Sequence, residues 1–328
     1  MLNFAIYGCG VISKTHAMAL NDVQGAQLIA CADFNPAAAE TFAQTNGIRM
    51  LPDWNALLQC DEVDAICICT PSGTHAPLAI EALNAGKHVV LEKPMALDTA
   101  QCDEIIAAAE RNQKHITVIA QMRTAPDIVR AKQLLQKGAL GQIIMAQLHM
   151  CYFRPITYYQ GSWRGTKKMD GGGALMNQGI HGVDILRNLM GPVKQVKSVV
   201  RTLLHDIEVE DAAVASLEFE SGAIGVITAS TATAPGYDRE LRIYGTRGGM
   251  EFKEDKMVRL VLDGVEQPCE AFVSTGAATS NLLLDYRGHA RQLDAFVRAI
   301  GGEDVDYPNQ YDGKQAVELI ETIYQETI

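Results

Sequence analysis

The sequence predicts an α/β protein in which a doubly wound parallel sheet is followed by an α+β domain built on a large, mostly antiparallel, open-faced sheet. In the first third of the chain, short continuous apolar runs alternate with helical segments, as expected for parallel strands covered on both faces. After about Gln121, long strand-like stretches succeed one another with little helix between them, which is typical of antiparallel sheets. We therefore expect two domains, residues 1–121 and residues 122–328.

Apolar runs in the first domain predict the strands Phe4–Tyr7, Leu28–Ala32, Ala65–Cys69, Val89–Leu91 and Ile116–Ala120. The segments between them predict helices that begin near Ile12 and Pro36 and that span Thr74–Ala85 and Thr99–Asn112. Asn35 and Asp98 are typical N-cap residues, and Gly47 and Gly86 mark helix ends. This regular alternation of strand and helix predicts the doubly wound sheet.

The second domain is expected to open with a helix, Asp127–Lys137, and a strand, Gln142–Cys151, followed by an irregular stretch as far as Gly173. Further strands are predicted at Val196–Leu204, Ala212–Phe219, Ala223–Ala232, Arg239–Tyr244, Gly249–Phe252 and Met257–Leu262. Short connections between them suit hairpins, which makes the sheet largely antiparallel. Two helices, His289–Ile300 and Lys314–Tyr324, are expected to close the chain.

Composition narrows the class of protein. The chain has 328 residues and a formal charge of −11, which argues against nucleic acid as a partner because phosphate binding needs clustered Lys and Arg. The basic cluster of Arg164, Lys167 and Lys168 is better suited to one small anion. Eight cysteines without framework spacing, of which Cys67 and Cys69 are interpreted as core residues, indicate reduced thiols. With no apolar run of membrane-spanning length and no signal segment, we expect a cytoplasmic protein without a membrane partner.

A glycine fingerprint lies between the first strand and the first helix. In the run Gly8-Cys9-Gly10-Val11-Ile12-Ser13, Gly8 permits a tight turn, Gly10 lets a pyrophosphate approach the backbone, and a small residue stands where a third glycine is common. The helix amino terminus there supplies N–H groups and positive dipole. Asp33, at the end of the second strand, can accept bonds from the adenosine ribose and would repel a 2′-phosphate. The first domain is therefore predicted to be a Rossmann domain that binds NAD through Gly8 to Ser13 and Asp33, with NADP less favoured.

A charged pair and a proline, Glu92-Lys93-Pro94, follow the apolar run Val89–Leu91. In an open α/β sheet the carboxyl ends of the strands border the ligand crevice. Lys93 is therefore a candidate for chemistry, although a solvated lysine at a strand exit is the alternative.

A second candidate segment begins with Gly171-Gly172-Gly173 and is predicted to continue as a helix. On a regular helix, Asn177, His181 and Asp184 would share one face. An amide, an imidazole and a carboxylate together suit proton transfer. The alternatives are a hydrogen-bonded core histidine or a metal site that uses His181 and Asp184; no third ligand stands at matching spacing, and we expect no metal.

Taken together, these motifs resemble the glucose-fructose oxidoreductase, inositol dehydrogenase and rhizopine catabolism (Gfo/Idh/MocA) oxidoreductases over nearly the whole chain. The resemblance rests on the fingerprint with His16, on Cys69-Thr70-Pro71-Ser72-Gly73-Thr74-His75, on Ala85-Gly86-Lys87-His88-Val89 leading to Glu92-Lys93-Pro94, and on the Asn177-His181-Asp184 segment. It implies that Lys93 touches the reacting hydroxyl, that His181 is the acid/base, and that the Lys93–Pro94 bond is cis. It also implies cofactor contacts by Thr70, Pro71, His75, Glu92, Lys93, Arg123, Trp163 and Arg164. Many members carry Asp where this chain has Asn177, which removes one possible base.

Within the family, several stretches look most like enzymes that oxidise UDP-linked N-acetylhexosamines or their uronates at C3. Arg154, Arg164 and Lys167 could face an anionic substrate group, and Tyr158, Tyr159 and Trp163 could stack on a sugar or uracil face, or all of these could simply pack. An inositol, cyclitol or free-glycoside 3-dehydrogenase is the alternative enzyme. A catalytically silent, dinucleotide-sensing regulator is the alternative from another class, and the presence of Lys93 and His181 argues against it.

The expected reaction is hydride transfer from a secondary sugar alcohol to the nicotinamide of NAD. We expect His181, oriented by Asp184, to accept the hydroxyl proton while Lys93 and Asn177 hold the oxygen; Lys93 as the base remains open. Lys93, Arg154, Tyr158, Tyr159, Lys167, Asn177 and His181 are the expected substrate contacts. The open face of the second sheet predicts a homodimer or homotetramer.

Overall fold

The structure, a computed structural model of the whole chain, describes residues 1–274 and 285–328. The chain forms two compact units. The first comprises Met1–Gln121 and Leu283–Lys314, and the second comprises Met122–Leu282 and Gln315–Ile328.

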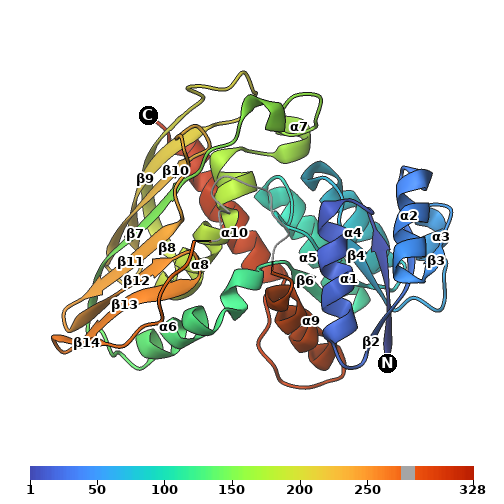
Figure 1. Cartoon of the computed structure of the whole chain (residues 1–328), viewed down its shortest axis with the longest axis horizontal. Coiled ribbons are helices and arrows are strands. Elements are labelled where there is room, and N and C mark those ends of the chain that lie inside the picture. Colours follow the sequence, from blue (N-terminus) through green and yellow to red (C-terminus); the bar gives the residue numbers. More distant parts are fainter. Residues whose placement is uncertain (275–284) are drawn as a thin grey trace. The chain divides into compact units, whose positions relative to one another are not determined.

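The first unit contains a parallel sheet of six strands in the order β3-β2-β1-β4-β5-β6 (Figure 1). Its strands are β1 (Leu2–Tyr7), β2 (Ala26–Ala32), β3 (Arg49–Met50), β4 (Ala65–Ile68), β5 (His88–Leu91) and β6 (Ile116–Val118). The predicted doubly wound parallel sheet is confirmed. The strand order reverses between β1 and β4, and in sheets of this kind the ligand crevice opens at the carboxyl ends of the strands at such a reversal.

Helices connect these strands: α1 (Val11–Asp22), α2 (Pro36–Asn46), α3 (Trp54–Leu58), α4 (His75–Asn84), α5 (Thr99–Asn112) and the 3-10 turn η1 (Ser72–Thr74). The predicted caps are present, since the Asn35 side chain accepts from Ala37 N at 3.1 Å and the Asp98 side chain accepts from Gln101 N at 2.8 Å. The short elements β3 and α3 escaped prediction because neither carries a full period of apolar residues.

Helix α9 (Arg287–Ile300) belongs to the first unit, which corrects the predicted boundary of 122–328 for the second domain. Its side chains Leu293, Phe296 and Val297 are buried in one core cluster with Phe4 and Leu20. The apolar face of α9 therefore packs against the core of the first unit, although more than 160 residues of chain separate α9 from β6.

The second unit contains an eight-stranded sheet in the order β14-β13-β12-β11-β7-β10-β9-β8. Its strands are β7 (Ile143–Cys151), β8 (Val193–Arg201), β9 (Ala212–Phe219), β10 (Ile224–Ser230), β11 (Glu240–Gly245), β12 (Gly248–Lys253), β13 (Lys256–Leu262) and β14 (Val265–Gln267). All neighbours pair antiparallel except β7 and β10, which are parallel. This confirms the mostly antiparallel sheet.

The remaining elements are the 3-10 turns η2 (Gln121–Thr124) and η3 (Ile156–Tyr158), the helices α6 (Pro126–Gln136), α7 (Lys167–Asp170), α8 (Ile180–Met190) and α10 (Gln310–Gln325), and the π-helix η4 (Ala174–Gly179). Helices α6 and α8 lie on one face of the eight-stranded sheet (Figure 1). The stretch expected to be irregular therefore contains two short helical elements. The helix expected after Gly173 begins instead as a π-helix and becomes α-helical only at Ile180.

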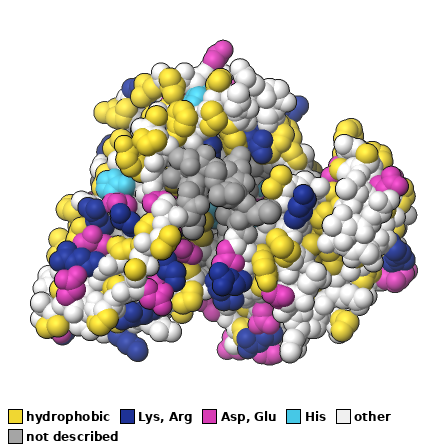
Figure 2. Space-filling model, viewed as in Figure 1, with side chains coloured by type: hydrophobic (Ala, Val, Ile, Leu, Met, Phe, Trp, Pro, Cys, Tyr) yellow, Lys and Arg dark blue, Asp and Glu magenta, His cyan; other side chains and the backbone are white. Residues whose placement is uncertain are grey.

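The surface carries charges of both signs. On the face shown in Figure 2, Lys and Arg side chains lie among Asp and Glu side chains, so no extended basic patch marks this face as a nucleic-acid site. Within residues 1–274 and 285–328, no helix has the length and apolar character needed to cross a membrane.

Candidate active site

The glycine fingerprint forms a tight turn at the end of β1. Gly8 has φ +96°, and a Cβ there would lie 2.7 Å from the carbonyl oxygen of Cys69, so only glycine fits without displacing the backbone. Gly10, the N-cap of α1, has no atom within 4 Å of the place a Cβ would take. The turn therefore pairs a close contact with β4 on one side with open space before the helix amino terminus on the other, as a pyrophosphate site requires.

The rest of the fingerprint supports this turn. Val11 is exposed and Ile12 half-buried at the start of α1, while Ser13 is fully buried with its hydroxyl donating to Gly10 O at 2.6 Å. Asp33 extends its carboxylate back across the end of β2, where Oδ2 accepts from Cys9 N at 2.6 Å and Oδ1 from Asn35 N at 2.7 Å. These residues fit NAD, because a carboxylate at the end of the second strand of such a sheet can accept hydrogen bonds from ribose hydroxyls.

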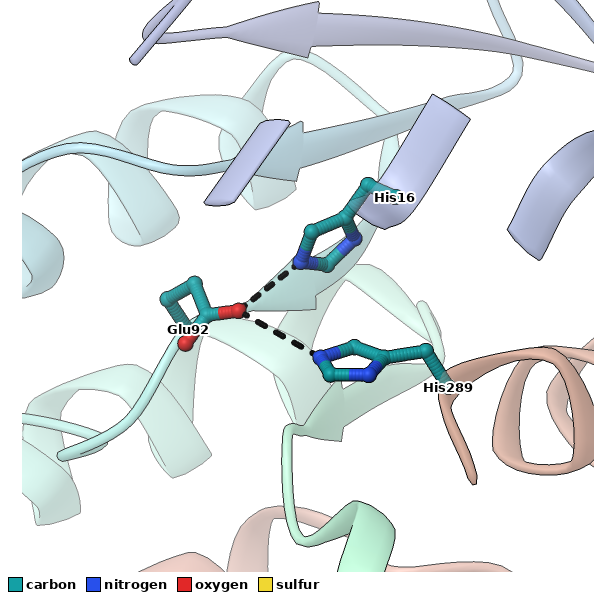
Figure 3. A group of neighbouring side chains, drawn as sticks. All are labelled: His16, Glu92 and His289. Carbon is teal, nitrogen blue, oxygen red and sulfur yellow. Dashed lines mark hydrogen bonds and ion pairs between the residues drawn. The ribbon is translucent and has the colours of Figure 1, made fainter. Parts of the chain in front are cut away.

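Lys93 follows β5 and is half-buried, and the Lys93–Pro94 bond is cis, as predicted. The neighbouring Glu92 points into the interior: its Oε1 lies 2.8 Å from His16 Nε2 and 3.9 Å from His289 Nε2 (Figure 3). Burial opposes ionisation of Glu92, but the two imidazoles outweigh it and hold its pKa well below the usual range. The Glu92 carboxylate therefore bonds within the domain core, and the expected contact of Glu92 with the cofactor stays a prediction.

His75 is also buried and bonded within the protein. Its Nδ1 lies 2.7 Å from Pro94 O and its Nε2 2.9 Å from Thr70 O, and burial lowers its pKa. The side chain thus joins the two loops that follow β4 and β5, and its expected contact with the cofactor stays a prediction. Thr70 and Pro71, both half-buried, precede η1 in the loop after β4, and their expected contacts with the cofactor stay predictions.

In the second unit, Asn177 lies within the π-helix η4 and is buried. Its Nδ2 donates to Asp170 Oδ1, and its Oδ1 accepts from Gln178 Nε2 at 2.7 Å. Asn177 therefore lies on a widened turn, whereas His181 and Asp184 lie on the regular helix α8, so the single regular helix predicted for the three residues is wrong. His181 is half-buried near the start of α8.

Asp184 forms a two-point ion pair. Its Oδ2 accepts from Arg123 Nε at 2.7 Å and its Oδ1 from Arg123 Nη2 at 2.6 Å. Both side chains are nearly buried, at 10% and 7% exposure. Arg123, expected to contact the cofactor, is therefore bound to Asp184 on the same helix as His181, and the pair fixes that helix against the start of the second unit.

The expected substrate residues form a second polar and aromatic group. Arg154 Nε and Nη2 donate to Gln178 Oε1 at 3.1 and 2.8 Å, and its guanidinium lies 5.9 Å from the Tyr158 ring. Arg164 lies 4.6 Å from the same ring and 5.2 Å from Trp163. Cations over aromatic faces are held in place by these rings.

Two members of the expected set differ in exposure. Lys167 is exposed at the start of α7, with its backbone N–H donating to Glu208. Tyr159 is buried: its hydroxyl donates to Thr231 at 3.1 Å, and burial raises its pKa to about 12. Tyr159 is therefore a core residue and not a stacking surface.

Two residues that hold the second group in place, Glu210 and His205, were not predicted from the sequence. Buried Glu210 accepts from Gly173 N at 2.9 Å and Leu175 N at 2.8 Å, which anchors the start of the π-helix, and burial raises its pKa. Buried His205 places Nε2 2.9 Å from Arg154 O and Nδ1 3.1 Å from Asp211. Two adjacent acids, Glu210 and Asp211, at the start of an apolar strand were the available signal.

The predicted residues thus gather in two groups, one at the carboxyl ends of β1, β2, β4 and β5 and one around η4. A family model described as "Oxidoreductase family, NAD-binding Rossmann fold" matches residues 2–120, and one described as "GFO/IDH/MocA C-terminal domain" matches residues 128–251. The chain belongs to the Gfo/Idh/MocA oxidoreductases. It is an NAD-binding oxidoreductase, and the predicted family and cofactor are confirmed.

Several members of the family are similar to this chain over most of their length. The chain is 26% identical to inositol 2-dehydrogenase of Rhizobium meliloti over 97% of this chain and 94% of that protein. It is 31% identical to scyllo-inositol 2-dehydrogenase (NAD(+)) of Bacillus subtilis over 75% of this chain and 72% of that protein. Among solved structures, the WlbA dehydrogenase of Bordetella pertussis in complex with NADH and UDP-GlcNAcA is 30% identical, has a TM-score of 0.88, and is matched over 99% of this chain and 96% of that chain.

Proposed function

We propose that this protein oxidises a secondary hydroxyl of a nucleotide-linked sugar, an N-acetylhexosamine or its uronate, with NAD as hydride acceptor. The observation that carries the proposal is the buried Arg154, bonded to Gln178 and lying beside the Tyr158 ring that Arg164 also covers. A cyclitol offers only hydroxyls, whereas two arginines beside aromatic rings suit a ligand with an anionic group and a flat base. The similarity to the WlbA complex supports the same substrate class.

The chemistry requires the hydroxyl to lose a proton as its carbon loses a hydride. When bound, NAD supplies the hydride acceptor. Lys93 stabilises the developing alkoxide with its ammonium group, and Asn177, whose amide nitrogen donates to Asp170, holds the same oxygen. His181 accepts the proton, on a helix held by the Asp184–Arg123 ion pair.

The decisive experiment measures NADH formation by absorbance with UDP-N-acetylglucosamine, its uronate, myo-inositol, scyllo-inositol and simple glycosides. We expect the UDP-uronate to have the highest kcat/KM. His181→Ala and Lys93→Met should each lower kcat by about 10²-fold or more, with NAD affinity within about threefold of wild type. Near-normal turnover of His181→Ala would move the base role to Lys93, and near-normal turnover of both variants would contradict the proposed site.

An inositol dehydrogenase is the second candidate, favoured by the relative matched over nearly the full chain. A substitution of Arg154 distinguishes the two candidate functions. Arg154→Met should raise KM for a UDP-uronate by about tenfold or more because a charged contact is lost, but should leave KM for an inositol within about twofold. A preference for inositols over every UDP-sugar would favour this second candidate.

A further inference from the structure

The turn that carries Lys93 is held by two buried ionisable side chains, one on each side of the Lys93–Pro94 peptide bond. On the amino side, Glu92 Oε2 accepts from the Lys93 backbone N–H at 3.2 Å. On the carboxyl side, His75 Nδ1 lies 2.7 Å from the carbonyl oxygen of Pro94. The backbone on both sides of Lys93 is thus fixed by side chains that lie in the interior, at 7% and 1% exposure.

Glu92 is itself fixed by histidines from distant parts of the first unit. His16 on α1 must carry its proton on Nε2 to donate to Glu92 Oε1 at 2.8 Å, because a carboxylate can only accept. His289 on α9 faces the same oxygen at 3.9 Å (Figure 3). Neither Nδ1 of His16 nor either ring nitrogen of His289 has a hydrogen-bond partner within the described residues. The negative charge of Glu92 is therefore the centre of this buried group.

The two ring nitrogens of His75 each lie near a backbone carbonyl oxygen, but a neutral ring carries only one N–H. Burial lowers its pKa, so near neutral pH the ring is neutral and can donate from Nδ1 or from Nε2, but not from both. The contact from Nδ1 to Pro94 O is shorter than that from Nε2 to Thr70 O, at 2.7 against 2.9 Å. A proton on Nδ1 would bind His75 to the Lys93 turn through Pro94 O, and a proton on Nε2 would bind it to Thr70 O; we infer the Nδ1 form, and the variants below test it.

We propose that Glu92, set by His16, and His75 are positioning residues that fix Lys93 for proton and hydride removal from the substrate. The proposal rests on the function proposed for Lys93. A lysine on a loop that is held only by its own peptide geometry would shift by an ångström or more, and a displacement of that size at a reacting group costs about 10²-fold in rate. The two hydrogen bonds remove that freedom on both sides of the residue.

The variants His75→Asn and His75→Gln test the position of the proton. The amide of asparagine reaches about as far as Nδ1 and that of glutamine about as far as Nε2. We expect His75→Asn to keep kcat within about threefold of wild type, and His75→Gln and His75→Ala to lower kcat by about tenfold to 10²-fold with the KM for NAD within threefold. Glu92→Gln should lower kcat similarly, because its amide cannot accept from both His16 and the Lys93 N–H.

The matched control is His88→Asn, which changes a partly buried histidine at the opposite end of β5, where Nδ1 accepts from His115 N at 3.1 Å. It should lower the melting temperature about as much as His75→Asn and leave kcat unchanged. If His75→Gln, His75→Ala and Glu92→Gln lower only the melting temperature, in parallel with the control, the positioning role is contradicted.

Further outcomes distinguish a failure of the positioning role from a failure of the proposed function. If Lys93→Met is inactive but the His75 and Glu92 variants turn over normally, the positioning role fails while the proposed function stands. If Lys93→Met is fully active, the role given to Lys93 fails and the positioning role fails with it. If the wild type oxidises none of the UDP-sugars, the proposed function fails. One equivalent of zinc or iron retained by the purified protein, measured by plasma mass spectrometry, would make His16, Glu92 and His289 metal ligands and overturn the role given to Glu92.

Discussion

At the scale of single residues, Asn177 shows how a neighbour decides which side chain a position accepts. Its amide nitrogen donates to Asp170, a carboxylate that is 1% exposed and also accepts from Gly165 N at 2.8 Å. An aspartate at 177, which the family resemblance led us to compare, would place a second carboxylate against the first. Two buried carboxylates at hydrogen-bond distance cannot both remain charged without a large cost.

We therefore predict that Asn177→Asp destabilises the protein by about 1–3 kcal/mol at pH 7, because a buried donor is replaced by a like charge. The new carboxyl would have a folded-state pKa above its unfolded value, so the cost is present at neutral pH and shrinks as pH falls through the raised folded pKa. Urea unfolding of both proteins at pH 7.5 and 5 measures the difference. A difference that does not shrink at pH 5 would contradict this account, and Asn177→Ser serves as the uncharged control.

The chemical identity of site residues could be predicted from the sequence, but not the direction of every side chain. Gly8, Asp33 and Lys93 stand at strand ends where topology alone places them near a ligand crevice. Glu92 and His75 occupy the same loops, yet their side chains turn inward to His16 and Pro94. Which way a side chain turns at a strand end depends on partners far along the chain, and local pattern does not report them.

At the scale of elements, the segment from Gly173 to Met190 departs from its pattern for a physical reason. Its sequence fits a regular helix, but Glu210 binds the N–H groups of Gly173 and Leu175 and both Asn177 N and Gln178 N donate to Gly173 O. The bond from Gln178 N spans five residues, the spacing of a π-helix, and the long-range bonds of Glu210 hold the start of this widened turn. The carboxylate that anchors it lies 37 residues away from Gly173 in sequence, so the periodicity of the helix could not predict it.

The glycine turn gives a prediction at the same scale, because its two glycines serve different purposes. Gly8→Ala would place a methyl 2.7 Å from Cys69 O at a positive φ, and should destabilise the protein by about 1–3 kcal/mol. Gly10→Ala meets no protein atom, so stability should change by less than about 1 kcal/mol while NAD affinity falls by tenfold or more, as the methyl occupies the approach to the helix terminus. Chemical unfolding and NAD titration by fluorescence measure the two quantities. Equal loss of stability in both variants would contradict the distinction.

At the scale of the whole molecule, the type of each sheet could be predicted from the sequence, because it depends on the spacing and composition of many residues. The membership of α9 could not, since a terminal amphipathic helix can cover either unit and the choice is made by side-chain fit to a core formed much earlier in the chain. Leu293 and Phe296 fill space between α1 and the sheet of the first unit, which ties the C-terminal part of the chain to the NAD-binding unit. His289, on this same helix, lies 3.9 Å from Glu92 Oε1, so the late helix also contributes to the surroundings of Glu92.

The histidines of the first unit predict how its stability depends on pH. Burial lowers the pKa of His75, His289 and His115. It lowers the pKa of His88 to about 4. Such groups are neutral in the folded chain but take up protons in the unfolded chain below about pH 6.5. Stability is therefore complete above pH 6.5 and is lost as pH falls from there toward the folded pKa values. Each proton bound only in the unfolded chain lowers the free energy of unfolding by about 1.4 kcal/mol per pH unit.

We expect the free energy of unfolding to fall by at least 1 kcal/mol per pH unit, roughly, between pH 6.5 and 5. Glu92, whose pKa is lowered, loses its contribution only below its ordinary value near 4.5 and does not contribute in this window. Guanidinium unfolding of Trp163→Phe, followed through the fluorescence of the buried Trp54, measures the first unit. Adding His88→Asn should make the dependence of the unfolding free energy on pH shallower, because this substitution removes one of the histidines that bind a proton only on unfolding. If the unfolding free energy of Trp163→Phe does not depend on pH in this range, or if His88→Asn leaves that dependence unchanged, the assignment of buried neutral histidines is contradicted.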